Sequence, residues 1–207
     1  MCKAMIKTGI MPDFITVDGG EGGTGAAPFD SMNWVGMPAE DALIYIYDAL
    51  VGFDLKKHIK LFVSGKVVSG FQVVRYLALG ADGCNSARGM MFALGCVQAL
   101  QCNENTCPSG VTTMNPRLAN GIVPEEKKIK VMNFHQNTIK SVNEMIGAGG
   151  LENLDQLNRK YIARRVGGGL IKTLDEIYPY PETGCLLKEN YPEKWQKDMS
   201  AADPDHF

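Results

Sequence analysis

The sequence has no hydrophobic run long enough to cross a membrane and no excess of charge of one sign. Its longest apolar tract, residues 90–100, contains Gln98 and is about half as long as a membrane-spanning helix. A formal net charge of −2 over 207 residues argues against a nucleic-acid or membrane partner. With 45% hydrophobic and 21% charged residues, the chain has the composition of a globular protein with its own core.

A secretory signal is also missing from the first residues. Residues 1–7 mix charged and apolar side chains and have no sustained hydrophobic centre. We therefore expect a cytoplasmic protein, in which cysteines stay reduced. The six cysteines are then free thiols or metal ligands rather than a disulfide framework.

Short β-branched runs alternate with helical patterns along the first half of the chain, which predicts a parallel sheet of the α/β class. After residue 107 the pattern becomes helical, and it is polar and rich in proline near the end. The expected strands are 14–18, 59–63 and 84–87, the expected helices are 38–53, 69–79, 88–101, 124–146 and 151–166, and from about residue 179 we expect an extended or disordered segment.

Glycine-rich loops, 18–28, 64–70 and 85–89, accompany the three expected strands. Ligands of parallel α/β folds bind at the carboxyl ends of strands, and glycine lets backbone N–H groups approach a phosphate. Lys66 and Arg88 add a cation to two of these loops. A simpler interpretation, tight turns that need positive φ, stays open. The glycine spacing argues against a dinucleotide fingerprint.

Three of the cysteines, Cys96, Cys102 and Cys107, lie close together in the sequence. Two residues six apart on one helix point to different sides, so their sulfurs converge only if the helix ends between them. The polar stretch 103–106 and Pro108 favour such a turn. Zinc is disfavoured because no Cys-x-x-Cys pair is present. Three alternatives remain. The three thiolates could hold an iron–sulfur cluster, Cys84 could join them as a fourth ligand, or the three cysteines could be unrelated buried thiols.

Two motifs resemble one known family when they occur in this order. They are Asp-Gly-Gly-Glu-Gly-Gly-Thr-Gly-Ala-Ala-Pro at 18–28 and Cys-x5-Cys-x4-Cys-Pro at 96–108, with Gly-Ala-Asp at 80–82 between them. Over about residues 1–170 the chain resembles the FMN-binding synthase domain of glutamate synthases. It is most similar to the stand-alone type that lacks the glutamine amidotransferase domain.

The resemblance implies a (β/α)8 barrel that carries FMN and a [3Fe–4S] cluster. Electrons would pass from a donor protein, a ferredoxin or an NAD(P)H-oxidising subunit, through the cluster to FMN. The product would be L-glutamate, made through 2-iminoglutarate from 2-oxoglutarate and ammonia or glutamine-derived nitrogen. The implied sites are Cys96, Cys102 and Cys107 for the cluster, Ser64, Gly65, Lys66, Ala87 and Arg88 for the FMN phosphate, and Gly20, Gly22, Gly23, Thr24 and Gly25 for the loop at the flavin and substrate.

The chain departs from the family pattern in two loops and in length. Ser-Gly-Lys stands at 64–66 where many relatives have Asp-Gly-Gly, and Ala87 stands where they have glycine. A complete barrel needs about 250 residues, whereas this chain offers three strand–helix units, which match units six to eight. We therefore expect a fragment of a longer protein. The lysine that the family carries at strand five is absent with the first five strands.

The expected organisation is a partial FMN-binding barrel with the cysteine loop at 1–113, a helical extension at 114–178 and an irregular tail at 179–207. Two other functions remain open. One is a non-catalytic module for electron transfer or subunit interaction, and the other is an amine-specific synthase that makes N-alkylated glutamate.

Overall fold

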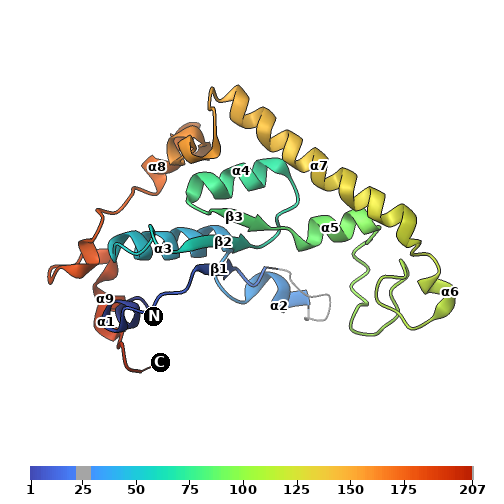
Figure 1. Cartoon of the computed structure of the whole chain (residues 1–207), viewed down its shortest axis with the longest axis horizontal. Helices are drawn as coiled ribbons and strands as arrows, with labels where there is room; N and C mark the ends of the chain where they lie inside the picture. Colours follow the sequence, from blue (N-terminus) through green and yellow to red (C-terminus); the bar gives the residue numbers. More distant parts are fainter. Residues whose placement is uncertain (22–28, 207) are drawn as a thin grey trace.

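The chain folds around a three-stranded parallel sheet with the strand order β1-β2-β3 (Figure 1). The computed structural model describes residues 1–21 and 29–206. The mixed α/β class with a parallel sheet, which the alternating pattern predicts, is confirmed. The elements of this part are β1 (Phe14–Asp18), α2 (Phe29–Trp34), α3 (Ala39–Gly52), β2 (Lys60–Ser64), α4 (Gly70–Leu79), β3 (Gly83–Asn85) and α5 (Ala87–Leu94).

One face of the sheet is covered by helices and the other is not. Leu61 and Val63 of β2 are fully buried in the same core cluster as Leu43 of α3. On the opposite face Phe14 is 58% exposed, and its ring packs edge to face with that of Phe62, at 5.7 Å between ring centroids. Parallel sheets are normally buried on both faces. Among the described residues, this sheet therefore lacks a cover on one side.

Helix α4 begins and ends where its sequence predicts. Ser69 and Gln72 form a capping box at its start. Gly80 ends the helix with φ +113°, and a Cβ atom at this position would lie 2.2 Å from the ring of Tyr47. Only glycine combines that backbone angle with so close an approach.

Helix α5 is shorter than the sequence predicts. The expected helix runs from Arg88 to about residue 101, but α5 ends at Leu94. Gly95 adopts φ +106° there, and its N–H donates to the carbonyl of Phe92. This left-handed cap stops the helix, so Cys96 lies on a loop and not on a helix.

The long helix α7 (Pro124–Ala148) is confirmed close to its predicted limits, and it runs along the outside of α4 and α5 (Figure 1). Its Val142 and Ile146 pack with Val74 and Ala78 of α4 in a second core cluster. Short α6 (Pro116–Ala119) precedes it. None of the helices in the described part of the chain combines the length and the apolar character needed to cross a bilayer.

The predicted helix at 151–166 is wrong. Asn153 and Asn158 each accept the N–H of the residue two positions later, and these local hydrogen bonds start short 3₁₀ turns in place of an α-helix. An antiparallel hairpin with a Gly-Gly-Gly turn follows, and Arg164 and Arg165 lie on its first strand instead of at a helix end. The elements are η1 (Leu154–Gln156), η2 (Arg159–Tyr161), β4 (Ala163–Gly167), β5 (Leu170–Thr173) and α8 (Leu174–Ile177).

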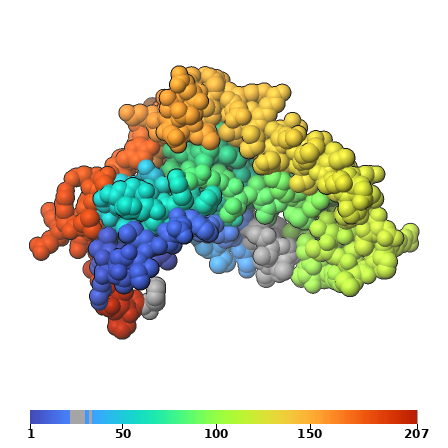
Figure 2. Space-filling view, in the orientation of Figure 1, coloured from blue at the N-terminus to red at the C-terminus, as the bar shows by residue number. Residues whose placement is uncertain are grey.

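The segment from residue 179, expected to be extended or disordered, contains η3 (Cys185–Leu187) and α9 (Glu193–Ala201). That expectation is wrong for these stretches because Trp195 and Met199 are buried in the main core cluster. Helix α9 lies beside the N-terminal helix α1 (Cys2–Thr8), as Figure 2 shows by its red and blue atoms. The Nζ of Lys3 donates to the carbonyl of Met199 at 2.6 Å, which ties the two helices together.

A buried ion pair fixes the segment after α7 to the sheet helices. Arg159 is fully buried, and its Nη2 donates to Oδ1 of Asp48 on α3 at 2.9 Å. Its Nη1 donates to the carbonyl of Tyr178 at 2.6 Å, and its guanidinium lies 4.3 Å from the ring centroid of Tyr180. The Nε atom has no hydrogen-bond partner among the described residues, and nothing in the structure accounts for that.

Asp82 links the turn before β3 to β2 at the opposite end of the sheet from the glycine loops. Its carboxylate accepts the N–H of Leu61 at 2.8 Å and pairs with Lys56 at 2.8 Å and Lys60 at 3.1 Å. Partial burial raises the pKa of Asp82, but hydrogen bonds from Lys56, Leu61 and Lys60 outweigh it and hold that pKa below its ordinary value.

We expect the contribution of Asp82 to stability to disappear in acid. A depressed folded-state pKa gives stabilisation that is fully present above the ordinary aspartate pKa, near 4, and is lost as the pH falls through the lower folded value. Asp82→Asn should therefore lower the unfolding free energy at pH 7 and flatten its decline below about pH 4. Urea titrations of both proteins across this range test it. An equal gap between the two proteins at pH 7 and pH 2 would contradict the assignment.

Candidate functional site

The loops that follow the three strands meet at one edge of the sheet. The parallel register places Asp18 beside Ser64, and Ser64 beside Asn85, so all three strands end at the same level. The predicted residues Ser64, Gly65 and Lys66 follow β2, while Ala87 and Arg88 begin α5 just after β3. This edge is therefore the candidate site.

The glycine loop after β1 is described only at its start. Gly20 has φ +63°, and its N–H donates to Oδ1 of Asp18 at 2.8 Å, which makes a tight turn. Four other residues predicted for this loop lie outside the described residues: Gly22, Gly23, Thr24 and Gly25.

Two glycines let the loops rest directly on the first residue of α3. A Cβ atom at Gly19 would lie 2.4 Å from the backbone nitrogen of Ala39. A Cβ atom at Gly65 would lie 2.6 Å from the Cβ atom of Ala39. Gly65 also has φ +156°, which side-chain-bearing residues rarely adopt. Ala39 itself is fully buried. The close packing therefore explains glycine at both positions, without reference to a ligand.

Lys66 has a carboxylate partner that sequence reasoning missed. Its Nζ lies 3.4 Å from Oε1 of Glu21, and the other oxygen of Glu21 accepts the N–H of Ala39 at 2.8 Å. The Lys66 side chain is 38% exposed and its backbone has φ +50°. Because Glu21 and Ala39 are 18 residues apart, no local pattern predicts their contact.

The start of α5 offers backbone N–H groups without a side-chain cap. Ser86 is the N-cap residue, but its hydroxyl donates to the carbonyl of Val67 at 2.6 Å and accepts no hydrogen bond from the helix. Ala87 and Arg88 occupy the first turn. Helix N-termini favour anions, and a phosphate could accept from these N–H groups. Together with Ser64 and Lys66, this donor set fits the phosphate of a group such as FMN.

The three clustered cysteines share one loop but differ in environment. Cys96 and Cys102 are half-buried, whereas Cys107 is 8% exposed and belongs to neither core cluster. The N–H of Thr112, followed by those of Val111 and Ser109, lowers the pKa of the Cys107 thiol, although burial raises it. Such a nest of N–H groups favours a thiolate.

The loop turns as the spacing predicts but does not gather the thiols. Gln98, Leu100 and Asn105 have φ values of 54°, 56° and 62°, so the chain reverses direction sharply between the cysteines. Within residues 1–21 and 29–206, no three His, Cys, Asp or Glu side chains are grouped so that they could hold a metal ion. In this arrangement the three cysteines do not fit a [3Fe–4S] cluster.

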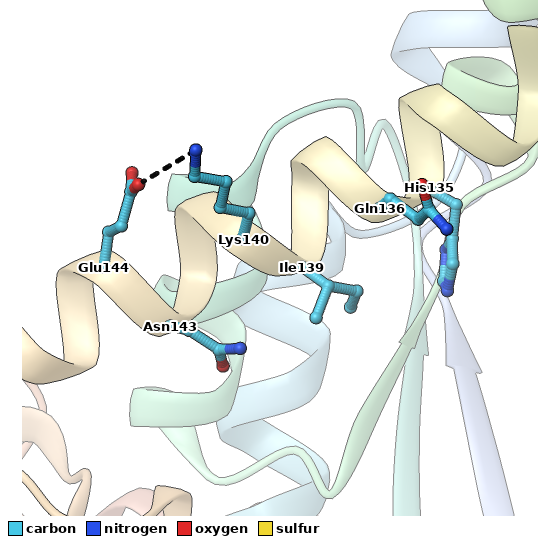
Figure 3. A pocket seen from close by; sticks show the side chains of 6 residues that line it. All are labelled: His135, Gln136, Ile139, Lys140, Asn143 and Glu144. Carbon is cyan, nitrogen blue, oxygen red and sulfur yellow. Dashed lines mark ion pairs between the residues drawn. The ribbon is translucent and has the colours of Figure 1, made fainter.

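A surface hollow on α7 is not a rival site. It is lined by His135, Gln136, Ile139, Lys140, Asn143 and Glu144, all from this one helix. Lys140 and Glu144 pair at 3.8 Å, and they point away from the side to which Ile139 and Asn143 point (Figure 3). Polar groups that diverge in this way cannot converge on a small ligand.

The comparison with family models decides the family. Residues 2–152 match the model described as the conserved region in glutamate synthase. The chain belongs to the glutamate synthase family. This confirms the resemblance carried by the two motifs.

Curated members of this family are similar to the chain over most of its length. The glutamate synthase large subunit-like protein YerD of Bacillus subtilis is 38% identical over 173 residues, which cover 84% of this chain and 33% of YerD. The archaeal glutamate synthase (NADPH) of Methanocaldococcus jannaschii is 32% identical over 145 residues, covering 70% of this chain and 28% of that protein. The chain thus spans about a third of the length of these relatives.

The solved structures that match are more distant. A mutant flavocytochrome b2 with pyruvate bound aligns with a TM-score of 0.46 and 15% identity, over 76% of this chain and 31% of that chain. A likeness this weak carries no argument about the present chain. The family assignment rests on the family model and on the curated relatives.

Proposed function

We propose that the chain is part of an FMN-dependent oxidoreductase of the glutamate synthase type. It would take part in converting 2-oxoglutarate and ammonia or glutamine-derived nitrogen, through 2-iminoglutarate, to L-glutamate. The observation that carries the proposal is the family match over residues 2–152. The uncapped helix start and the glycine loops at the carboxyl edge of the sheet support it.

The three-stranded sheet would form units six to eight of a (β/α)8 barrel that the rest of a longer protein completes. The uncovered face of the sheet, on which Phe14 is 58% exposed, supports this. The length of the chain supports it too, because the chain spans about a third of each relative. A hollow of about 330 Å³ lies beside β3, lined in part by Cys84, Met90 and Phe134. Neighbouring barrel elements would cover these surfaces. The division into 1–113, 114–178 and 179–207 stays part of this proposal.

FMN, when bound, would supply the hydride that reduces the imine carbon. The chain's own part would be to bind and orient it. The N–H groups of Ala87 and Arg88 would donate hydrogen bonds to the phosphate at the start of α5. Ser64 and Lys66 would add donors from the loop after β2, and Gly65 keeps that loop close to α3.

The assignment of Cys96, Cys102 and Cys107 to a [3Fe–4S] cluster stays a prediction from the resemblance. The loop would have to gather the three thiols, which is not its arrangement here. A ferredoxin or an NAD(P)H-oxidising subunit would be the electron donor.

The test measures cofactors and product together. The chain, and the full-length product wherever the gene encodes more, would be purified without oxygen and analysed for flavin, iron and sulfide. Glutamate formation from ammonia and 2-oxoglutarate would be assayed with a reduced donor, and with methylamine in place of ammonia to separate the amine-specific alternative. Absence of bound flavin from the full-length product would refute the proposal.

If the loop gathers the three thiols around a cluster in the full-length product, Cys102→Ser should abolish iron and sulfide binding while flavin content stays unchanged, because the cluster would lose one of its three thiolate ligands. Cys2→Ser, on the N-terminal helix, is the control and should retain both cofactors. If iron content is the same in both variants and the parent, the cysteines are structural thiols.

A second candidate is a module for electron transfer or subunit interaction that has no turnover alone. The uncovered sheet face favours it, since the isolated chain would leave that face to a partner. Cofactor binding without glutamate formation by the 207-residue chain would support this reading.

A further inference from the structure

Glu21 connects three segments that are distant in the sequence. It follows β1, its Oε2 accepts a hydrogen bond from the first residue of α3, and its Oε1 lies near Lys66 in the loop after β2. The Glu21 side chain is 21% exposed, so it is mostly enclosed by these neighbours. A single carboxylate thus links the start of the loop after β1 and the loop after β2 to the same helix.

The first of these contacts substitutes for a missing helix cap. The residue before α3 is Pro38, which makes no side-chain cap hydrogen bond. The N–H of Ala39 is one of the helix-start donors that have no partner inside the helix. Glu21 accepts it at 2.8 Å, and its negative charge is favourable at a helix N-terminus.

The second contact restrains a loop with an unusual backbone. Lys66 has φ +50°, and Gly65 before it has φ +156°. Left-handed conformations are unfavourable for residues with a side chain and persist where the surroundings hold them. The 3.4 Å ion pair with Glu21 holds the Lys66 side chain in place.

Packing brings the same elements together. Gly19, two residues before Glu21, and Gly65, one residue before Lys66, both rest on Ala39. Backbone contact and carboxylate contact therefore converge on the first residue of α3. A loop that moved away from Ala39 would lose both together.

We propose that Glu21 is a positioning residue that holds the loops after β1 and β2 at a fixed separation and sets the position of the Lys66 ammonium at the site. The inference rests on the proposed function only for the identity of the ligand, because the linkage itself is a property of the protein alone. The two oxygens have separate tasks: Oε2 caps α3, and Oε1 orients Lys66.

The test separates those tasks by NMR of the full 207-residue chain. Glu21→Gln keeps an oxygen for the N–H of Ala39 and removes the charge beside Lys66. We expect it to retain slow amide exchange at Ala39 but to shift the Lys66 Nζ resonance. Glu21→Ala should also speed amide exchange at Ala39, by about fivefold, the effect of losing a helix cap. Lys66→Met should leave the amide exchange of Ala39 as slow as in the parent chain.

A matched control is Glu40→Gln, on the next residue of α3. Its carboxylate also carries ion pairs, with Arg75 at 2.8 Å and Arg164 at 3.3 Å, but neither of these partners lies in the glycine loops. The control should leave the Lys66 Nζ resonance unchanged. If Glu21→Gln leaves it unchanged too, the inference is overturned. Should Glu21→Ala fail to fold, Glu21→Gln and Lys66→Met still decide the matter.

A second measurement distinguishes this inference from the proposed function. FMN binding is followed by the quenching of flavin fluorescence. If the parent chain binds FMN, Glu21→Ala should weaken binding at least fivefold, the factor expected from the lost cap, and equal affinity would overturn the positioning role. If the parent chain does not bind FMN, the NMR result alone supports or overturns the linkage, and the flavin content of the full-length product decides the proposed function.

Discussion

Replacement of Arg159 by alanine is expected to lower the unfolding free energy by about 3 kcal/mol. The guanidinium is fully buried, and the Asp48 carboxylate that it meets at 2.9 Å is 3% exposed. Removal of one partner of a buried pair leaves the other charge in a poorly solvating environment. Lys194, 3.0 Å from Asp48, still pairs with it, so we expect the lower end of the usual range.

Thermal unfolding checks this result, and about 3 kcal/mol corresponds to a melting temperature lower by about 10 °C for a chain of this size. Arg164→Ala is the control. Arg164 is 53% exposed and pairs with Glu40 at 3.3 Å, so its loss should cost less than about 1 kcal/mol. Similar melting temperatures for the two variants would show that Arg159 does not fix the segment after α7 to α3.

Replacement of Gly19 by alanine is expected to destabilise the chain by about 2–3 kcal/mol and to disturb the candidate site. The added Cβ would lie 2.4 Å from the backbone nitrogen of Ala39, and a backbone atom cannot rotate away as a side chain can. Helix α3 would have to shift, and the hydrogen bond from Ala39 to Glu21 would lengthen. Denaturant titration and the amide exchange rate of Ala39 measure the two effects.

Gly147→Ala is the matched control for this variant. Gly147 lies in α7, and a Cβ there would meet nothing within 4 Å. Alanine should therefore stabilise the helix by up to about 1 kcal/mol. If Gly19→Ala proves as stable as the parent, the close contact between the loop and α3 is not a constraint.

Much of the sheet can be predicted from the sequence because its signals are local. Strand β1 is a β-branched run ended by glycines, and α4 carries a capping box at Ser69 and a glycine at its end. The common edge of the loops follows from the rule that parallel strands end together. Helix α5 is harder, because the apolar run through Gly95 looks continuous while the φ of that glycine ends the helix.

The errors after α7 and the missed residue at the site have a different origin. Asn153 and Asn158 start 3₁₀ turns through local hydrogen bonds, in a stretch whose composition suits a helix. Helix α9 depends on burial of Trp195 in a core formed far away in the sequence. Glu21 acts through Ala39 and Lys66, 18 and 45 residues away. Partners at such distances leave no periodic trace in a single sequence.

The pairing of α1 with α9 has a consequence for biosynthesis. The hydrogen bond from Lys3 to Met199 spans 196 residues, and Met5 is buried in the cluster that contains Trp195. Ribosomes add about 5–20 residues per second, so roughly 10–40 seconds pass between the synthesis of α1 and the synthesis of α9, which covers the apolar side of α1. During that interval a nascent chain presents this side to chaperones, and translational pausing before α9 would prolong its exposure.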